Sequence, residues 1–248
     1  MTRLDVLMVE LGLCESRNRA SMLIKSGSVL VDGQVESKPS RQIDCNPSIF
    51  IDGWDIQIID DIKYVSRAGI KLEAALDSFE IDVTGKTAVD IGASTGGFCD
   101  CLIQRDIDFV YAVDVGKDQL HPKIKENSHV LDMPGINART LTKKNFNKQI
   151  DIVTMDVSFI SQTLIYPAVS DILTEGGVFV SLIKPQFEVG RENIGKRGIV
   201  RGSKKLYGTM FENIKNTADR NGLALQKYID SPIKGSDGNI EFLAFFKK

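Results

Sequence analysis

The sequence predicts an α/β protein in which a doubly wound, mostly parallel sheet follows a small α+β domain. In residues 62–248, apolar runs of strand length alternate with helical patterns, and this alternation is typical of a parallel sheet covered by helices on both faces. In residues 1–61, two short helical patterns precede a hairpin signal. At 248 residues, the chain is long enough to bury a core in a standard domain with a small appendage.

The N-terminal domain is expected to contain two helices and a hairpin. Residues 3–12 place apolar side chains three and four positions apart, and Gly12 is a suitable end for this helix. Ser16 precedes a second helical pattern that ends at Gly27. The run VLVDGQV then places two β-branched stretches on either side of an Asp-Gly pair, which is a strong signal for a two-residue hairpin turn.

The larger domain is expected to begin with a helix after Val65. Strands are expected over residues 87–91, 109–114, 151–156, 177–183, 223–230 and 241–246, with a further strand near residue 130. Helices are expected over residues 97–105, 161–174 and 204–221. The apolar runs are far shorter than a membrane span and the N-terminus does not look like a signal peptide, so we expect a cytoplasmic protein.

A glycine-rich loop follows the first strand of this domain. The segment DIGASTGGF (residues 90–98) leads directly into a helix, and open α/β sheets bind ligands at the carboxyl ends of their strands. The next strand ends at Asp114, twenty-two residues after Gly92, where a carboxylate can accept hydrogen bonds from ribose hydroxyls. Ser94 occupies the second glycine position of a dinucleotide fingerprint, and Asp90 would repel a pyrophosphate. The pattern therefore favours S-adenosylmethionine, with its cationic methionine portion, over a dinucleotide.

Four ionisable residues occupy positions that this fold normally leaves apolar or small. Asp156 ends the strand DIVTMD, Lys184 ends the run SLIK, Glu241 opens the last strand, and Lys71 lies in the helix before the first strand. The strands that end at Asp156 and Lys184 should have their carboxyl ends next to each other, beside the cofactor. We therefore expect the four side chains to form one Lys-Asp-Lys-Glu group.

Seven segments resemble the TlyA, or hemolysin A, family of ribosomal RNA 2′-O-methyltransferases: YVSRAGIKL, DIGASTGGFCDCL, AVDVGKDQL, MDVSFIS, LIKPQFEVG, KRGIV and SPIKGSDGNIEF. In the first sixty residues, the pattern SRNRA…I..G.V.VDG resembles an S4-like RNA-binding domain. The resemblance covers essentially the whole chain. It implies a class I, Rossmann-like methyltransferase fold of the FtsJ-like type. It also implies S-adenosyl-L-methionine as the cofactor and ribosomal RNA, in an assembled or partly assembled subunit, as the partner.

The resemblance also implies roles for individual residues. The family's catalytic tetrad falls on Lys71, Asp156, Lys184 and Glu241. Its cofactor-binding positions correspond to Asp90, Gly92, Ala93, Ser94, Gly96, Gly97, Phe98, Asp114, Asn137 and Asp156. Cys99 stands where the family usually has threonine, a change from which we expect little effect. Ile136 replaces another common threonine, and this leaves the residue that contacts adenine open.

Basic residues are expected to contact the RNA. Between Lys184 and Lys205 there are seven basic residues and two acidic ones, so the overall charge of −2 hides a strongly basic segment. Within this segment we expect the loop over residues 189–201 to clamp RNA. The candidate RNA-binding residues are Arg17, Arg19 and Lys25 in the S4-like domain, Arg67 in YVSRAGIKL, and Arg191, Lys196, Arg197 and Arg201 in the loop.

A ribose 2′-hydroxyl is a poor nucleophile, so methyl transfer to it needs a base or strong polarisation, together with in-line alignment. We expect Lys184 to receive the hydroxyl proton, Asp156 to orient that lysine, and Lys71 with Glu241 to position the ribose. The chain ends seven residues after Glu241, as in the shorter members of the family. This likeness implies a cytidine of large-subunit ribosomal RNA as the target, with small-subunit RNA as a further candidate.

Other functions stay open at the level of the sequence. Base methylation is disfavoured, because the segment DVSF at residues 156–159 lacks the prolines of base-amine methyltransferases. A ribosome-assembly factor that binds RNA with little catalysis is one alternative. A membrane-active haemolysin, as the family's older name suggests, is another, but every apolar segment is better assigned to the packed sheet or its helices. Four cysteines and two histidines show no ligand spacing, so no metal is expected.

Overall fold

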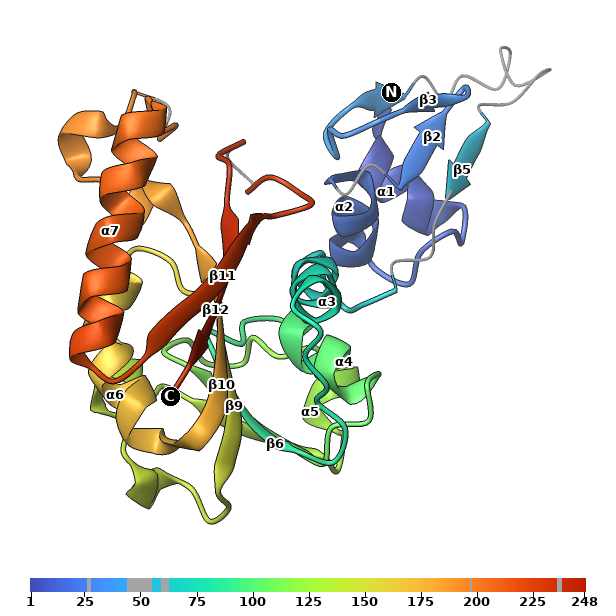
Figure 1. Ribbon diagram of the computed structural model, residues 1–248. Coiled ribbons are helices and arrows are strands. Elements are labelled where there is room, and N and C mark those ends of the chain that lie inside the picture. Colours follow the sequence, from blue (N-terminus) through green and yellow to red (C-terminus); the bar gives the residue numbers. More distant parts are fainter. Residues whose placement is uncertain (26–27, 44–54, 59–62, 197, 236–237) are drawn as a thin grey trace. The chain divides into compact units, whose positions relative to one another are not determined.

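The computed structural model describes residues 1–25, 28–43, 55–58, 63–196, 198–235 and 238–248 (Figure 1). Contacts divide the chain into two compact units, Met1–Arg67 and Ala68–Lys248. The predicted domain boundary between residues 61 and 62 lies outside the described residues. Each unit has a hydrophobic core of its own.

The described residues of the N-terminal unit form two helices and several short strands. Its elements are β1 (Thr2–Arg3), α1 (Leu4–Glu10), α2 (Arg17–Lys25), β2 (Val29–Val31), β3 (Gln34–Val35), β4 (Gln42–Ile43) and β5 (Ile56–Ile58). Strand β2 lies between β3 and β5 in an antiparallel sheet, and β1 pairs with β4. The turn after β2 has positive φ at both central residues, 53° at Asp32 and 73° at Gly33, which suits the twist of a hairpin. The hairpin prediction is therefore confirmed.

The C-terminal unit is built on a seven-stranded sheet in the order β11-β12-β10-β9-β6-β7-β8. The strands are β6 (Thr87–Ile91), β7 (Phe109–Asp114), β8 (Val130–Pro134), β9 (Ile150–Met155), β10 (Leu173–Ile183), β11 (Ala224–Asp230) and β12 (Phe242–Lys247). Neighbouring strands are parallel except at β12, which runs antiparallel to both β10 and β11. The predicted doubly wound, mostly parallel sheet is confirmed.

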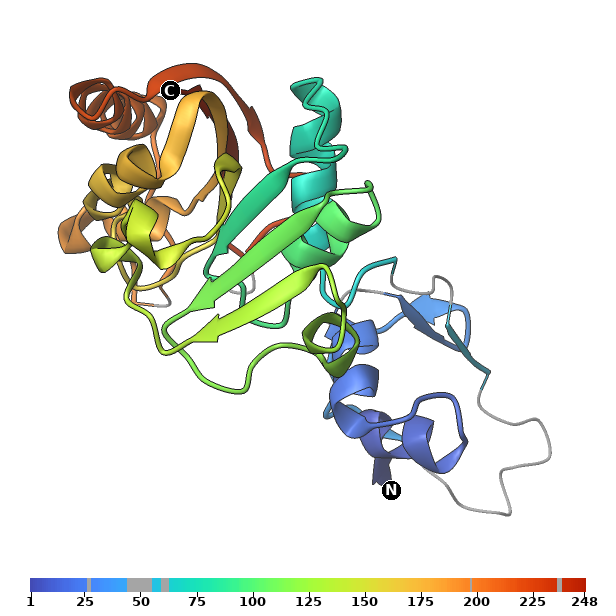
Figure 2. The same cartoon turned by 90° about the horizontal axis from the view of Figure 1, so that it is seen from below.

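Helices cover both faces of this sheet, with α3 and α4 on one face and α6 and α7 on the other (Figure 2). The α-helices are α3 (Ala68–Ser78), α4 (Gly97–Ile103), α5 (Pro122–Lys125), α6 (Tyr166–Ile172) and α7 (Lys204–Arg220). Short 3₁₀ turns are η1 (Ala138–Thr140), η2 (Lys143–Asn145), η3 (Gln162–Leu164), η4 (Pro185–Phe187) and η5 (Arg191–Asn193). Because both faces are covered, all five residues of β6 are buried.

The prediction of one helix over residues 161–174 is wrong in its extent. The segment forms η3 and then α6, and β10 already begins at Leu173. Pro167 explains the interruption, because proline has no N–H to donate and is tolerated in the first turn of a helix. Several predicted strand ends also differ by one residue, and two of these concern predicted site residues, since Asp156 follows β9 and Glu241 precedes β12.

The register of the central strands determines where a ligand site can form. Ile91, the last residue of β6, pairs with Val113 of β7 on one side and with Met155 of β9 on the other. Since these strands are parallel, their carboxyl ends meet at one edge of the sheet, which is where such sheets bind ligands. The glycine-rich loop, Asp114 and Asp156 all lie at this edge.

Candidate active site

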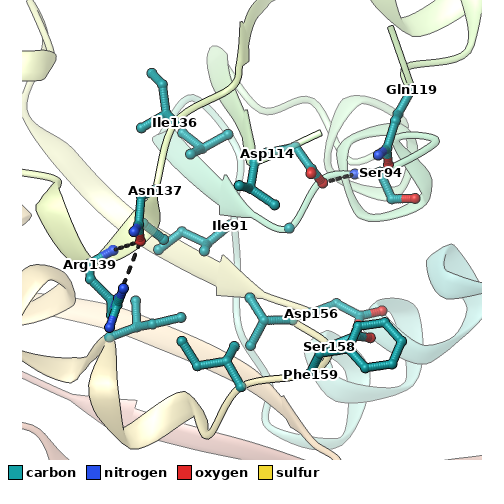
Figure 3. Close-up of a pocket in the computed structure, with 17 residues that line it drawn as sticks. Ile91, Ser94, Asp114, Gln119, Ile136, Asn137, Arg139, Asp156, Ser158 and Phe159 are labelled. Carbon is teal, nitrogen blue, oxygen red and sulfur yellow. Dashed lines mark hydrogen bonds between the residues drawn. The ribbon is translucent and has the colours of Figure 1, made fainter. Parts of the chain in front are cut away.

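A cavity of about 540 Å³ lies at the carboxyl ends of β6, β7 and β9 (Figure 3). This volume falls within the range of roughly 300–1,000 Å³ that is usual for small-molecule sites. Five of the predicted cofactor-binding residues line it: Gly92, Ser94, Asp114, Asn137 and Asp156. The other predicted cofactor-binding residues, Asp90, Ala93, Gly96, Gly97 and Phe98, are not among those that line this cavity.

The loop between β6 and α4 approaches the end of β9 so closely that no side chain fits at Gly92. The backbone of Gly92 has φ of 82°, and a Cβ atom there would lie 2.3 Å from the carbonyl oxygen of Asp156. Ser94 also adopts the left-handed region, with φ of 47°, although it is not glycine. Gly96, with φ of 88°, then caps the N-terminus of α4. The loop therefore needs glycine at Gly92 for both its dihedral angle and its space.

Asp114 fastens the glycine-rich loop to the end of β7. Its Oδ2 accepts a hydrogen bond of 2.8 Å from the backbone N–H of Ser94, as Figure 3 shows, and its Oδ1 accepts one of 2.7 Å from Gly116. Each carboxylate oxygen has a further lone pair. Asp114 can therefore hold the loop and still accept hydrogen bonds from ligand hydroxyls in the cavity.

Asp90 is fully buried behind the loop. Its carboxylate accepts hydrogen bonds from the Thr154 hydroxyl at 2.8 Å and from the Cys99 thiol at 3.1 Å. Burial raises the pKa of Asp90 to about 7, although these two hydrogen bonds act in the opposite direction. From the sequence, cysteine in place of threonine at position 99 was expected to have little effect. The structure shows that the residue at this position donates a hydrogen bond to the buried carboxylate of Asp90.

The four residues of the predicted tetrad, Lys71, Asp156, Lys184 and Glu241, form two ion pairs. Lys184 Nζ lies 2.5 Å from Asp156 Oδ1 and also donates a hydrogen bond of 2.9 Å to the hydroxyl of Ser158. Lys71 Nζ donates a hydrogen bond of 2.5 Å to Glu241 Oε2. The first pair is half-buried, with side chains 13% and 19% exposed, while Lys71 and Glu241 are buried.

Strand register brings the two ion pairs next to each other. Ile183 of β10 pairs with Phe242 of β12 in the antiparallel ladder. Lys184, which follows Ile183, therefore lies beside Glu241, which precedes Phe242. Lys71 reaches Glu241 from α3, which packs against β12. Asp156 lies one strand further along, after β9, and lines the cavity. The four side chains of the predicted Lys-Asp-Lys-Glu group thus form two ion pairs at neighbouring strand ends, and one of the four, Asp156, lines the cavity.

Several residues that line the cavity were not singled out from the sequence as cofactor contacts. They include Gln119, Ile136, Arg139, Ser158 and Phe159. Asn137 Oδ1 accepts a hydrogen bond of 3.1 Å from the backbone N–H of Arg139 and so orders the turn that holds Ile136 against the cavity. The only sequence signal for Ser158 and Phe159 was their place in DVSF, directly after Asp156.

The predicted RNA-binding residues fall into two groups. In the N-terminal unit, Arg17 forms an ion pair of 3.3 Å with Asp5, and Arg67 donates a hydrogen bond to the carbonyl oxygen of Lys25 at 3.3 Å. Arg19 is half-buried on α2, and Lys25, the last residue of the same helix, is exposed. In the other unit, Arg191, Lys196 and Arg201 lie in one loop, whereas Arg197 is outside the described residues.

Several hydrogen bonds hold the backbone of the described residues in that basic loop. Ile194 and Val200 form an isolated β-bridge, and the N–H of Arg201 donates to the carbonyl oxygen of Asn193 at 2.9 Å. The buried side chain of Asn239 accepts from the N–H of Val200 at 2.9 Å and donates to the carbonyl oxygen of Gly198 at 3.0 Å. The segment is therefore tied to the connection that leads to Glu241.

Two further kinds of site were sought in the described parts of the chain. No group of three or more His, Cys, Asp and Glu side chains is placed to hold a metal ion there. No helix within those parts is both long and apolar enough to cross a membrane.

The sheet order with its antiparallel β12, the glycine-rich loop and the cavity at the carboxyl ends of the strands define a class I, Rossmann-like methyltransferase domain. The FtsJ-like methyltransferase family matches residues 64–248, and the S4 domain matches residues 2–45. The chain belongs to the TlyA, or hemolysin A, family of FtsJ-like methyltransferases that carry an N-terminal S4 domain. The resemblance that the motifs indicate is confirmed.

Relatives match over nearly the whole chain. Hemolysin A of Brachyspira hyodysenteriae is 41% identical, covering 98% of this chain and 99% of the relative. The 16S/23S rRNA (cytidine-2′-O)-methyltransferase TlyA of Mycobacterium tuberculosis is 33% identical, covering 99% of this chain and 89% of the relative. A solved structure of a hemolysin-family protein from Streptococcus thermophilus is 40% identical with a TM-score of 0.77, covering 100% of this chain and 88% of that one.

Proposed function

We propose that this chain is an S-adenosylmethionine-dependent ribosomal RNA 2′-O-methyltransferase that acts on a cytidine ribose of large-subunit RNA. The observation that carries the proposal is the pair of adjoining lysine–carboxylate contacts beside the cavity, at the ends of β9, β10 and β12. Methylation of a hydroxyl needs one group that takes up a proton and others that hold the ribose. A cluster of two lysines and two carboxylates can provide both.

The cavity fits S-adenosylmethionine in size and in the chemistry of its lining. Asp114 offers free lone pairs to ribose hydroxyls at the end of β7. Because Gly92 has no side chain, its backbone can lie close to Asp156 at the cavity wall, where any side chain at Gly92 would clash with Asp156. We assign Gly92, Ser94, Asp114, Asn137 and Asp156 as the residues that would line the bound cofactor. When bound, S-adenosylmethionine supplies an electrophilic methyl group on a sulfonium.

We assign Asp90, Ala93, Gly96, Gly97 and Phe98 a supporting part in the cofactor site. Phe98 and Ala93 are buried, and Gly96 caps the N-terminus of α4, so these residues set the course of the loop that carries Gly92 and Ser94. The hydrogen bonds of Asp90 to Thr154 and Cys99 link β6 to β9 and α4 beneath that loop. Their effect on cofactor binding is therefore indirect.

The proposed reaction uses Lys184 as the group that receives the proton of the 2′-hydroxyl. A charged lysine has no lone pair, so Lys184 must be in its neutral form when the O–H bond breaks and the new N–H bond forms. Asp156 and Ser158 fix the direction of Nζ through contacts of 2.5 Å and 2.9 Å. Lys71 and Glu241 are buried beside this pair and position the ribose. Holding the hydroxyl in line accounts for much of the acceleration that such a site can give.

The RNA is proposed to contact both domains. The S4 match covers α1 and α2, and we assign Arg17, Arg19, Lys25 and Arg67 as contacts in that unit. In the catalytic unit, the basic loop with Arg191, Lys196, Arg197 and Arg201 follows the segment that carries Lys184. Basic side chains supply affinity through phosphate contacts without reading the sequence. Cytidine and ribosomal RNA come to this proposal from the name of the M. tuberculosis relative.

The proposal is tested with ribosomal subunits from cells that lack this protein. Purified enzyme and radiolabelled S-adenosylmethionine are added, the RNA is digested, and the nucleosides are identified by mass spectrometry. Label in 2′-O-methylcytidine of large-subunit RNA, absent with Lys184→Ala, is the expected result. Label in a methylated base would overturn the reaction class, and label in small-subunit RNA alone would overturn the target. No label with intact cofactor binding would favour the alternative of a ribosome-assembly factor.

A further inference from the structure

Two segments that carry tetrad residues lie against each other over several contacts. The first, called here the β9 loop, comprises residues 156–161, and the second, the β10 segment, comprises residues 184–188. At their shared beginning, Lys184 meets Asp156 at 2.5 Å and Ser158 at 2.9 Å. The two segments therefore meet first at the proposed proton acceptor.

The middle of the β9 loop is strained. Phe159 is 92% exposed and has φ of 65°, in the left-handed region that non-glycine residues rarely adopt. Such a conformation is energetically unfavourable for a non-glycine residue and persists only where the surrounding structure holds it. Burial of the side chain cannot hold it, since Phe159 is exposed. One neighbour is Phe187 of the β10 segment, whose ring centroid lies 5.4 Å from that of Phe159.

Glu188 closes the far end of the two segments. The Ser161 hydroxyl donates a hydrogen bond of 2.6 Å to Glu188 Oε2, and the backbone N–H of Gln162 donates one of 2.9 Å to Glu188 Oε1. Burial raises the pKa of Glu188, against the effect of these two hydrogen bonds. A carboxylate that is largely removed from water is costly unless it is hydrogen-bonded, so both of its oxygens are used to fix the end of the β9 loop.

We propose that Glu188 is a positioning residue for the tetrad. By bonding Ser161 and Gln162, it holds the β9 loop in its strained course, and this course places Asp156 and Ser158 at the ammonium group of Lys184. The inference rests on the proposed methyl transfer, because its predicted effect is on that reaction. If the far end of the β9 loop were not held, Asp156 and Ser158 would no longer fix the position of the Lys184 ammonium group. A misplacement of about 1 Å in such a site can lower a rate on the order of 100-fold.

The test compares Glu188→Ala and Glu188→Gln with the control Glu175→Gln. Glu175 is an exposed carboxylate near the start of β10, at the end of the strand away from Lys184, and its ion pair is with Lys248 at 3.3 Å. We expect Glu188→Ala to lower kcat for subunit RNA on the order of 10- to 100-fold, with KM and cofactor affinity changed less than about 3-fold. Glu188→Gln should recover part of kcat, because its amide oxygen still accepts one hydrogen bond. Glu175→Gln should match the wild type.

A double-mutant cycle and hydrogen exchange separate positioning from general stability. If Glu188 acts through Ser161, the Ser161→Ala/Glu188→Ala double variant should be no slower than Glu188→Ala alone. Amide exchange measured by mass spectrometry should rise in residues 156–162 and stay unchanged in β6 and β7. Normal kcat in Glu188→Ala, additive losses, or exchange that rises evenly through the domain would each overturn the proposal.

The same data keep the two hypotheses apart. If the wild type transfers no methyl group to RNA while Glu188→Ala still speeds exchange only in the β9 loop, the proposed function fails and the structural role of Glu188 stands. If the wild type is active and the β9 loop exchanges equally in both proteins, the role of Glu188 fails and the proposed function stands.

Discussion

Lys71 and Glu241 are 170 residues apart in the chain, yet Lys71 Nζ donates a 2.5 Å hydrogen bond to Glu241 Oε2. Lys71 lies on α3 and Glu241 lies just before β12, and both side chains are buried. Opposite charges held away from water are tolerated as a pair, because removal of either partner leaves the other desolvated and uncompensated. This contact therefore stabilises the fold, in addition to its part in the proposed tetrad.

The first prediction separates these two contributions. Lys71→Met leaves Glu241 buried without its partner, so it should lower the free energy of unfolding by about 3–5 kcal/mol. The double variant Lys71→Met/Glu241→Leu removes both charges and should recover most of that loss, while methyl transfer stays lost in both proteins. Urea unfolding and the methyltransferase assay measure the two effects. A double variant as unstable as the single one would show that the charge pair itself holds α3 to β12.

The second prediction concerns the chemical part played by Lys184. Lys184→Arg keeps the positive charge but cannot accept a proton, because arginine does not deprotonate in proteins. If Lys184 receives the hydroxyl proton, both Lys184→Arg and Lys184→Ala should lower kcat by a factor on the order of 10² to 10⁴. Single-turnover methyl transfer to subunit RNA measures this, with cofactor binding checked by calorimetry.

Lys148→Arg is the matched control for this test. Lys148 forms an exposed ion pair of 2.7 Å with Asp108, away from the tetrad, so the exchange should leave kcat unchanged. Wild-type activity in Lys184→Arg would instead mean that the lysine acts through its charge alone.

The sequence predicted most of the fold, and the parts that it missed have physical causes. The pairing of Asp156 with Lys184 could be expected, because parallel neighbouring strands end at one edge. The particular partner of Lys71 could not be read from the sequence, since it depends on how α3 packs on an antiparallel strand that arrives 170 residues later. The face of the sheet to which the Asp90 side chain points could not be predicted either. Strand β6 is buried on both faces, so its sequence shows no alternation of apolar and polar residues.

Backbone strain was equally invisible in the sequence. Ser94 and Phe159 adopt positive φ although neither is glycine, and no composition signal marks such positions. Both line the cavity, which agrees with the tendency of strained residues to lie at functional sites.

The third prediction tests the close approach at Gly92. Gly92→Ala places a Cβ atom 2.3 Å from the carbonyl oxygen of Asp156, so the loop and the end of β9 must move apart. Cofactor affinity should fall at least on the order of 10-fold, because the cavity wall and Asp156 shift together. Titration calorimetry with S-adenosylmethionine measures this change.

Gly222→Ala is the control for the cost of positive φ. Gly222 has φ of 70° but no atom within 4 Å of an added Cβ, so the variant pays only the dihedral strain of roughly 1–2 kcal/mol. Its cofactor affinity should equal that of the wild type. Equal affinity in Gly92→Ala would mean that the approach of the two segments is not needed for binding.

The fourth prediction follows from the buried carboxyl group of Asp90. Its pKa is raised from 3.8 to about 7 in the folded protein, mainly by burial. Between these two values the folded state keeps a proton that the unfolded state has lost, so this group makes stability fall as pH rises from about 4 to 7. The shift of about three units corresponds to roughly 4 kcal/mol, which is fully lost above pH 7.

Asp90→Asn removes this titration while leaving a side chain of the same shape beside Thr154 and Cys99. The free energy of unfolding of the variant minus that of the wild type should therefore increase from pH 5 to pH 8, by an amount on the order of 1–3 kcal/mol, because only the wild type loses stability over this range. Urea unfolding at both pH values measures the difference, and Asp82→Asn, at an exposed carboxylate, serves as the control. A constant difference between the two pH values would mean that Asp90 is already ionised at pH 5, with Cys99 and Thr154 sufficient to hold its charge.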